Sequence, residues 1–274
     1  MALDPTYAAY DALLQANVSP QGVTYAAIGP AGLDPFLAEL AAVDLRELNS
    51  IEQKALYINA YNALTLDLIA ENPGVASIRD LDGGKVWSTR RFTVGGQSLT
   101  LDDIEHKRLR PMGDPRVHAA LSCASKGCPA LLSRAYTAER LNDQLDLACR
   151  AWVRSNAAQI NTQAKTVALS SIFDWYGDDF LAQWEDKANI PGVEGKQQAA
   201  LNFIAFYSGS ATATWLTAGG YTVTWATYDW GIGGEQPVSA ATPRSGSRPC
   251  RTPRHRRRSA SSRNSRRGRR GSSR

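Results

Sequence analysis

The residues best suited to chemistry lie together in the middle of the chain. Between positions 105 and 128 the sequence holds Glu105, His106, His118, Cys123 and Cys128, and residues 1–236 contain no other histidine. A thiolate is a strong nucleophile, imidazole exchanges protons near neutral pH, and both groups also bind zinc. Any chemistry of this protein is therefore predicted to centre on the segment from Glu105 to Cys128.

Cys123 is the best candidate for a nucleophile. It follows a predicted buried strand over residues 116–122 and precedes a tight loop that contains Gly127 and Pro129. Main-chain amides of such a loop could stabilise an oxyanion, and Lys126 could favour the thiolate. Cys128 reads as a packing or resolving thiol. This first interpretation is a thiol-dependent acyl-transfer enzyme, of the peptidase or amidase type, acting on a peptide or another amide.

The identity of the base depends on side-chain direction. On a helix that begins at Leu101, Glu105 falls on the apolar face and His106 at its margin. A buried carboxylate needs a partner, but adjacent helical residues diverge, so we expect Glu105 to orient an imidazole from across the fold. His118 and Cys123 would face opposite sides of a continuous strand. We therefore favour His106 as the base and keep His118 as the alternative.

Other interpretations of the segment stay open. Cys123 and Cys128 with the two histidines could bind zinc, although the histidine spacing is not typical of zinc sites. The two cysteines could instead form a disulfide, which would matter in an oxidising compartment. The domain could also be a non-catalytic binding or structural module whose polar cluster holds the loop. We assign no metal ligand and no cofactor.

Polar residues outside this segment have weaker claims. Asn59 and Asn62 share one face of a strongly apolar helix, and buried amides must be hydrogen-bonded. They could bind a substrate carbonyl or hold the loop after Cys123, but binding a neighbouring backbone is the commoner role of such side chains. Three aspartates near a Trp-Tyr pair could supply a further catalytic group, or could be charges at helix ends: Asp174, Asp178 and Asp179.

The elements that position these residues mix helices and short strands without regular alternation. The patterns predict a hairpin around Gly95-Gly96 and a helix from Thr100, capped with Asp103. Further predicted helices are 35–43, 51–71 with a Ser50/Gln53 capping box, 137–158, 172–184 and 196–207, and further predicted strands are 167–170 and 221–225. This order predicts a single-domain α+β fold, with several helices around a small, mostly antiparallel sheet. We divide it into an N-terminal helical segment (1–49) packed on a core domain (50–235).

The C-terminal residues have a different composition. Residues 237–274 contain 13 arginines and no acidic residue, which leaves 18 basic and 26 acidic residues in positions 1–236. Residues 236–274 are therefore predicted to be a disordered tail. An acidic body disfavours nucleic-acid binding by the domain, so only the tail, if genuine, would bind such a partner. No apolar run is long enough to span a membrane. The first residues do not have the pattern of an export signal, so the localisation expected from the sequence as written is cytoplasmic, with export expected if the true start lies further upstream.

Three motifs together resemble a known family. The runs ALYINAYNALTLDLI, FTVGGQSLTLDDIEHKRLR and DPRVHAALSCASKGCPAL, followed by TYDW, resemble the family catalogued as domain of unknown function 547 over about residues 50–232. The resemblance implies a shared core of Asn59, Tyr61, Asn62, Glu105, His106 and Cys123. It also implies that His118 and Cys128 belong to the bacterial pattern of that family. A more distant likeness to cysteine-peptidase folds is weaker, because here the histidine precedes the cysteine.

Overall fold

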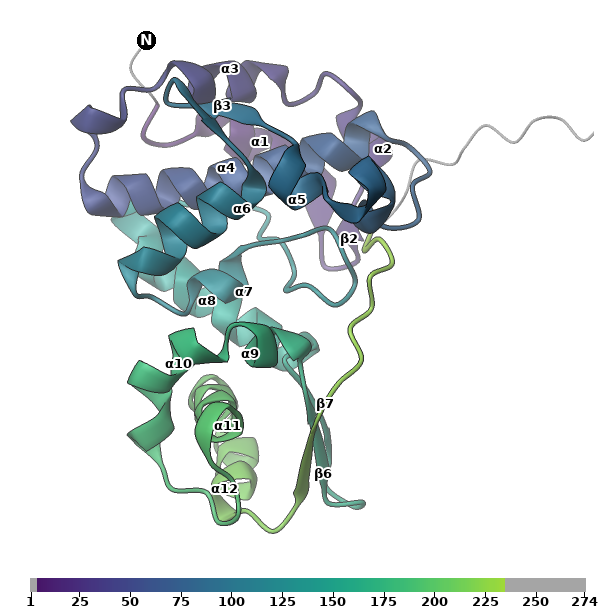
Figure 1. The fold of residues 1–274 in the computed structure, drawn as a ribbon, viewed down its shortest axis with the longest axis vertical. Coiled ribbons are helices and arrows are strands. Elements are labelled where there is room, and N and C mark those ends of the chain that lie inside the picture. The colour runs from purple at the N-terminus through teal and green to yellow at the C-terminus, as the bar shows by residue number, and fades with distance from the viewer. Residues whose placement is uncertain (1–3, 235–274) are drawn as a thin grey trace, which may run out of the picture. The chain divides into compact units, whose positions relative to one another are not determined.

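The computed structural model describes residues 4–234, which form one helix-rich unit with three small sheets (Figure 1). The predicted α+β class is confirmed. The predicted tail, 236–274, lies outside the described residues.

The helices differ widely in length. The α-helices are α1 (Ala8–Asn17), α2 (Tyr25–Ile28), α3 (Asp34–Ala42), α4 (Ser50–Glu71), α5 (Val86–Thr89), α6 (Leu101–Ile104), α7 (Val117–Ala120), α8 (Leu141–Ser155), α9 (Ser171–Trp175), α10 (Gly177–Trp184), α11 (Gly195–Tyr207) and α12 (Ser210–Ala218). Short 3-10 turns lie at Leu45–Glu47, Ile78–Gly84, Arg110–Met112, Ala138–Arg140 and Glu185–Lys187, and a π-helical turn at Glu105–Leu109.

The strands are short and pair mostly in antiparallel fashion. They are β1 (Val18–Ser19), β2 (Gly22–Val23), β3 (Phe92–Val94), β4 (Gln97–Leu99), β5 (Ala158–Asn161), β6 (Thr166–Leu169) and β7 (Thr222–Trp225). The hairpin predicted around Gly95-Gly96 is confirmed by the register Phe92↔Leu99. In the largest sheet, of order β5-β6-β7, β7 pairs parallel to β6.

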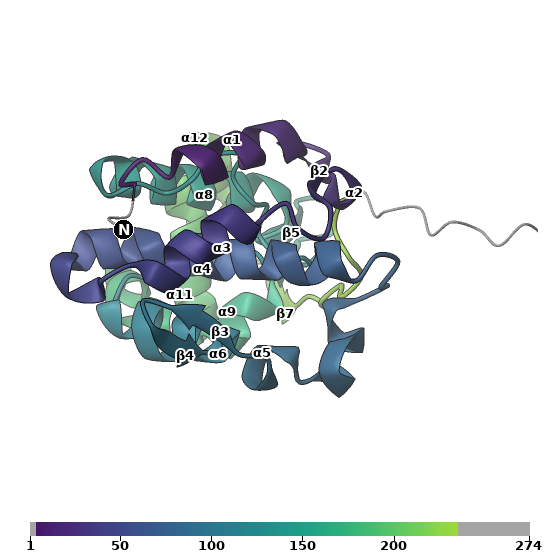
Figure 2. The ribbon, with the colours of Figure 1, turned by 90° about the horizontal axis from the view of Figure 1, so that it is seen from above.

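Helix α4 is the central element of the N-terminal part. It contacts α2, α3, α6 and the π-helical turn, and in Figure 2 it runs between α1 on one side and α5 with α6 on the other. Nearly every residue from Ala55 to Ala70 is buried, as its apolar sequence predicts. The predicted Ser50/Gln53 capping box is wrong by one residue, because Asn49 and Glu52 form it.

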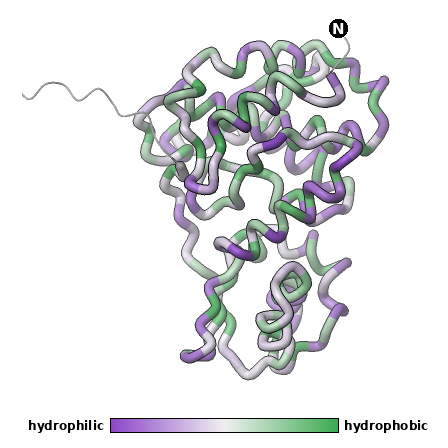
Figure 3. Tube along the Cα trace, turned by 180° about the vertical axis from the view of Figure 1, so that it is seen from behind, coloured by the Kyte–Doolittle hydropathy of each residue, from purple (hydrophilic) through white to green (hydrophobic). Residues whose placement is uncertain are grey.

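The buried apolar side chains form two clusters. The first packs α1, α3 and α4 with later residues up to Leu145 and with Ile232, and the second packs the later part of α8 with α9, α10 and α11. Figure 3 shows hydrophobic and hydrophilic residues alternating along the elements of both parts. That alternation is what helices and strands with one buried face require.

The predicted strand over residues 116–122 is wrong. Residues Val117–Ala120 form α7, where His118 N–H donates to Pro115 O and Leu121 N–H donates to Val117 O. Instead of a neighbouring strand, the Asn62 side chain pairs with the backbone on both sides of Leu121. His118 and Cys123 therefore do not lie on opposite faces of a strand, as the sequence had predicted.

No helix in residues 4–234 has the length and apolarity that crossing a bilayer requires.

Candidate functional site

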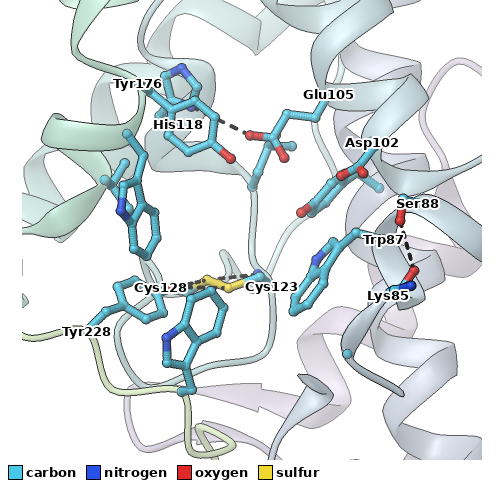
Figure 4. A pocket seen from close by; sticks show the side chains of 16 residues that line it. Lys85, Trp87, Ser88, Asp102, Glu105, His118, Cys123, Cys128, Tyr176 and Tyr228 are labelled. Carbon is cyan, nitrogen blue, oxygen red and sulfur yellow. Dashed lines mark hydrogen bonds and ion pairs between the residues drawn. A yellow bond between two sulfur atoms is a disulfide. The ribbon is translucent and has the colours of Figure 1, made fainter. Parts of the chain in front are cut away.

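A pocket of about 300 Å³ lies at the carboxyl-terminal end of α7, in front of the cysteine loop (Figure 4). The polar and cysteine residues that line it are Tyr61, Lys85, Ser88, Asp102, Glu105, His118, Cys123, Cys128, Tyr176 and Tyr228. Its aromatic walls are Trp87, Trp175 and Trp230. The pocket therefore draws residues from widely separated parts of the sequence to one place.

The two cysteines of the loop are joined in a disulfide, which lies across the pocket between Tyr228 and Trp87 in Figure 4. Of the three interpretations of these cysteines, this geometry corresponds to the disulfide. Cys128 is 8% exposed and Cys123 is more accessible. The third described cysteine, Cys149, is a free buried thiol whose pKa is raised by its burial.

The cysteine loop is held by a segment that follows β7, here called the strap and defined as residues 226–234. The strap carbonyls of Gly231 and Asp229 accept hydrogen bonds from Lys126 N–H (2.8 Å) and Gly127 N–H (2.9 Å). Gly233 N–H donates in return to Ala124 O at 2.8 Å. These bonds tie the loop at three points to residues about a hundred positions later.

The strap bonds bear on the expected oxyanion hole. The amides of Lys126 and Gly127 donate to the strap, and the amide of Cys128 donates to Ser125 O at 3.0 Å. An amide that already donates in this way is not available to a substrate oxyanion. These three amides of the loop therefore serve its own fold.

Tyr228, from the strap, places its side-chain hydroxyl beside both sulfurs. Its hydroxyl lies 3.1 Å from Cys123 Sγ and 3.1 Å from Cys128 Sγ. Burial, with a further contribution from the Glu105 charge, raises the pKa of Tyr228 well above the usual value for a phenol. The hydroxyl therefore stays protonated and donates to sulfur. Gly127 packs directly under the Tyr228 ring.

Glu105 and His118 are a buried carboxylate and a buried imidazole that line the pocket side by side. Glu105 is 7% exposed, and its Oε1 lies 3.9 Å from His118 Nδ1 (Figure 4). The His118 ring stacks on Tyr176 with centroids 4.3 Å apart. Burial and the nearby Glu105 charge raise the pKa of Tyr176 above its usual range. The sequence predicted that Glu105 orients an imidazole from across the fold. In the structure the ring of His118 lies 3.9 Å from its carboxylate, and the orienting role itself stays a prediction.

A second carboxylate holds the far side of the His118 ring. His118 Nε2 donates to Asp179 Oδ2 at 2.8 Å, and Arg110 Nε and Nη2 form a two-bond pair with the same carboxylate. Burial alone would raise the pKa of Asp179, but the His118 and Arg110 hydrogen bonds hold it below its usual range. Asp179 therefore keeps a negative charge beside His118.

His106 lies away from the pocket. Its side chain is 39% exposed, its Nδ1 is 3.0 Å from Arg110 Nη1, and its Nε2 is 3.9 Å from Asp102. It is not among the residues that line the pocket. Of the two histidines weighed as the base, His118 is thus the one that the fold brings to Glu105.

Asn59 and Asn62 each hold a segment of backbone. Asn62 Nδ2 donates to Ala120 O at 2.9 Å, and its Oδ1 accepts from Ser122 N–H at 2.9 Å. Asn59 makes the same pair of bonds to the carbonyl and amide of Tyr136, at 2.8 and 2.9 Å. Asn62 therefore fixes the backbone immediately before Cys123, whereas Asn59 fixes a segment after the loop.

Residues 4–234 do not bring the four side chains proposed as zinc ligands together as a metal site. Cys123 and Cys128 are bonded to each other and His106 lies outside the pocket. Over residues 4–234, no three His, Cys, Asp or Glu side chains are grouped as a metal site.

The geometry joins the motifs that the sequence had singled out. The segment from α4 to α8 carries Asn62, Glu105, His118 and the cysteine loop in one structural unit. Residues 45–153 match the family model described as Protein of unknown function, DUF547. The resemblance drawn from the sequence motifs is confirmed over this range.

The DUF547 match covers only part of the pocket. It includes Glu105, His118 and both cysteines, but it ends before Asp179 and Tyr228. No curated protein and no solved structure matches the chain. The distant likeness to cysteine peptidases therefore remains a prediction.

Sequence reasoning missed the role of Tyr228 and weighed Asp179 only as one of three aspartates. The available signal was aromatic density: Trp175, Tyr176, Tyr228 and Trp230 fall in two short stretches next to acidic residues. Such clusters often line pockets, but their sequence positions do not reveal that they face the cysteines.

Proposed function

We propose that the pocket is the active site of a thiol-dependent acyl-transfer enzyme, in which the reduced thiol of Cys123 is the nucleophile. The observation that supports this function is the shared lining of one pocket by Cys123, by the Tyr228 hydroxyl 3.1 Å from its sulfur, and by Glu105 with His118 behind it. A nucleophile, a hydrogen-bond donor and a proton carrier are the groups that acyl transfer needs.

In the first step the Cys123 thiolate attacks the carbonyl carbon of a peptide or another amide. A C–S bond forms and the carbonyl electron pair moves to oxygen. Tyr228 is the donor for that oxyanion, because its neutral hydroxyl already lies within hydrogen-bond distance of the attacking sulfur. In this mechanism the Tyr228 hydroxyl takes the role that the amides of Lys126, Gly127 and Cys128 cannot take, since those three already donate within the fold.

Glu105 and His118 carry the proton. The thiol proton passes to this pair and returns to the amine as the C–N bond breaks, which leaves an acyl group on Cys123. Asp179 and Arg110 fix the far nitrogen of His118, so the ring keeps its orientation toward Glu105. Water then attacks the thioester carbonyl carbon and gives a proton to the same pair. The C–S bond breaks, Cys123 leaves with the electron pair as a thiolate, and the acid is released.

The test is acylation of the reduced chain by a p-nitrophenyl ester, followed by mass-spectrometric mapping. The Cys128→Ser variant keeps Cys123 free, and we expect a thioester on Cys123 in preference to Cys149. In that background Tyr228→Phe should slow acylation by roughly 10²–10³-fold, the cost of losing one oxyanion donor. Tyr221→Phe is the matched control, because its hydroxyl donates only to Leu216 O outside the pocket.

Two outcomes contradict the proposed function. One is equal labelling of Cys123 and the buried Cys149, since an activated nucleophile must react faster than an inert thiol. The other is a Tyr228→Phe variant that reacts as fast as the Tyr221→Phe control.

A specific observation favours a second candidate, a non-catalytic binding module. Trp175 is 47% exposed at the pocket and stacks on Trp230 with centroids 5.7 Å apart. Exposed aromatic walls are typical of binding sites. For such a module, removing the Cys123 thiol would change stability and leave binding of a pocket ligand intact.

A further inference from the structure

We infer that the Cys123–Cys128 disulfide undergoes exchange with small thiols, in which the incoming thiolate attacks Cys123 and Cys128 departs. This activity belongs to the oxidised protein. It goes beyond acyl transfer and does not depend on it.

The two cysteine residues differ in exposure. Both cysteines line the pocket, but Cys128 is 8% exposed whereas Cys123 is more accessible. A pocket of about 300 Å³ admits a small thiol rather than a folded protein domain. Exchange depends on which sulfur an attacking thiolate can reach, so access favours attack on Cys123.

The two sulfurs also differ in their hydrogen-bond donors. Cys128 Sγ accepts from Cys123 N–H at 2.9 Å and lies 3.1 Å from the Tyr228 hydroxyl. Within residues 4–234, the Tyr228 hydroxyl, also at 3.1 Å, is the one hydrogen-bond donor that faces Cys123 Sγ. A departing thiolate is stabilised by each donor that faces it. Departure of Cys128 is therefore favoured over departure of Cys123.

The donors are fixed in place before the bond opens. Asn62 holds Ser122, the residue before Cys123, and the strap holds Lys126 and Gly127 inside the loop. The backbone amide that faces Cys128 Sγ therefore needs little rearrangement to receive the developing charge. Such preorganisation lowers the cost of the step.

The reaction consumes two thiols. The first thiolate forms a bond to Cys123 Sγ as the Cys123–Cys128 bond breaks, and Cys128 leaves with the electron pair as a thiolate. A second thiolate attacks the sulfur of the bound thiol and releases Cys123 as a thiolate. The two thiols are oxidised to one small disulfide, the protein gains two electrons, and the two protons go to the cysteines or to water.

The experiment treats the oxidised full chain with excess glutathione near neutral pH, in the absence of any acyl donor. Samples quenched early by N-ethylmaleimide are mapped by mass spectrometry. We expect glutathione on Cys123 and N-ethylmaleimide on Cys128. In the Tyr228→Phe variant the opening rate should fall roughly tenfold, because the departing sulfur loses one of its two donors. The Tyr221→Phe control should open at the unmodified rate.

Three results would overturn the inference: glutathione bound mainly to Cys128, a disulfide that opens only after denaturation, or equal rates in the two tyrosine variants. Each concerns the oxidised pair alone. None bears on whether the reduced Cys123 accepts an acyl group, so the two proposals can fail separately.

Discussion

Removing the Asn62 side chain should both destabilise the protein and reduce the asymmetry of the cysteine pair. Asn62 is 1% exposed and makes two hydrogen bonds, one to Ala120 O and one to Ser122 N–H. In Asn62→Ala both backbone groups lose their partner inside the protein. Each such loss costs about 1–3 kcal/mol, and Ser122 is only partly buried, so we expect a fall of about 2–4 kcal/mol in the free energy of unfolding.

The chain offers a matched control on the same helix. Asn59 is equally buried and makes the same pair of bonds, but to Tyr136. Asn59 also interacts with the Tyr7 hydroxyl. We therefore expect Asn59→Ala to destabilise the protein at least as much as Asn62→Ala.

Only Asn62→Ala should change the chemistry of the disulfide. Its loss loosens Ser122 and so the neighbouring Cys123 amide, which donates to Cys128 Sγ. The preference of glutathione for Cys123 over Cys128 should therefore fall several-fold, since each 1.4 kcal/mol of preference is a factor of ten. Asn59→Ala should keep the preference of the unmodified chain.

Urea unfolding of the oxidised protein measures the first effect, and early-quench mapping well below the unfolding midpoint measures the second. Equal loss in both variants of the preference of glutathione for Cys123 would contradict this prediction, because the loss would then follow from general destabilisation. It is also refuted if Asn62→Ala costs less than about 1 kcal/mol, the lower bound for a single lost partner.

Two further predictions concern groups outside the acid-base pair. Burial raises the pKa of Asp67 from its usual value of 3.8 to about 6. The ionised carboxylate therefore lowers the free energy of unfolding, and this loss is absent below about pH 4 and complete above about pH 6. The free energy of unfolding of Asp67→Asn, measured by chemical unfolding, should exceed that of the unmodified protein by an amount that grows from near zero at about pH 4 to at most about 3 kcal/mol above about pH 6. A difference that is the same at pH 4 and pH 7 would contradict this prediction. A Cβ at Gly127 would lie 2.8 Å from the Tyr228 ring, so Gly127→Ala should cost about 1–3 kcal/mol. That cost should shrink in a Tyr228→Ala background, and an unchanged cost would exclude the ring as its cause.

Local patterns were enough to predict the long helix and the hairpin. The apolar residues from Ala55 to Ala70 and the turn at Gly95-Gly96 specify their structures within short windows. The strand predicted over residues 116–122 is wrong because a short apolar stretch fits a strand and a helical turn equally well. The backbone at the end of this turn is bonded by the Asn62 side chain, which lies 58 residues from Ala120 in sequence and is therefore outside any local pattern.

The candidate site, too, was predictable only where local sequence patterns determine it. Helical phase predicted that Glu105 points inward and that His106 sits at the margin, and the structure has Glu105 buried and His106 partly exposed. The hydrogen-bond partners of His118 and Cys123 could not be predicted from the sequence, because Asp179 lies 61 residues from His118 and Tyr228 lies 105 residues from Cys123. No local period links positions so far apart, so their proximity is a property of the tertiary fold.

The strap has a consequence for the order of events during synthesis. Tyr228 follows Cys123 by 105 residues, and the carbonyls that bind Lys126 and Gly127 belong to the same late segment. A chain is made from its amino terminus at about 5–20 residues per second, so the cysteine loop is synthesised several seconds before the strap that holds it. During that interval the two thiols meet any oxidant or alkylating agent without the phenol beside them. Their chemistry on the nascent chain therefore precedes, and differs from, their chemistry in the finished pocket.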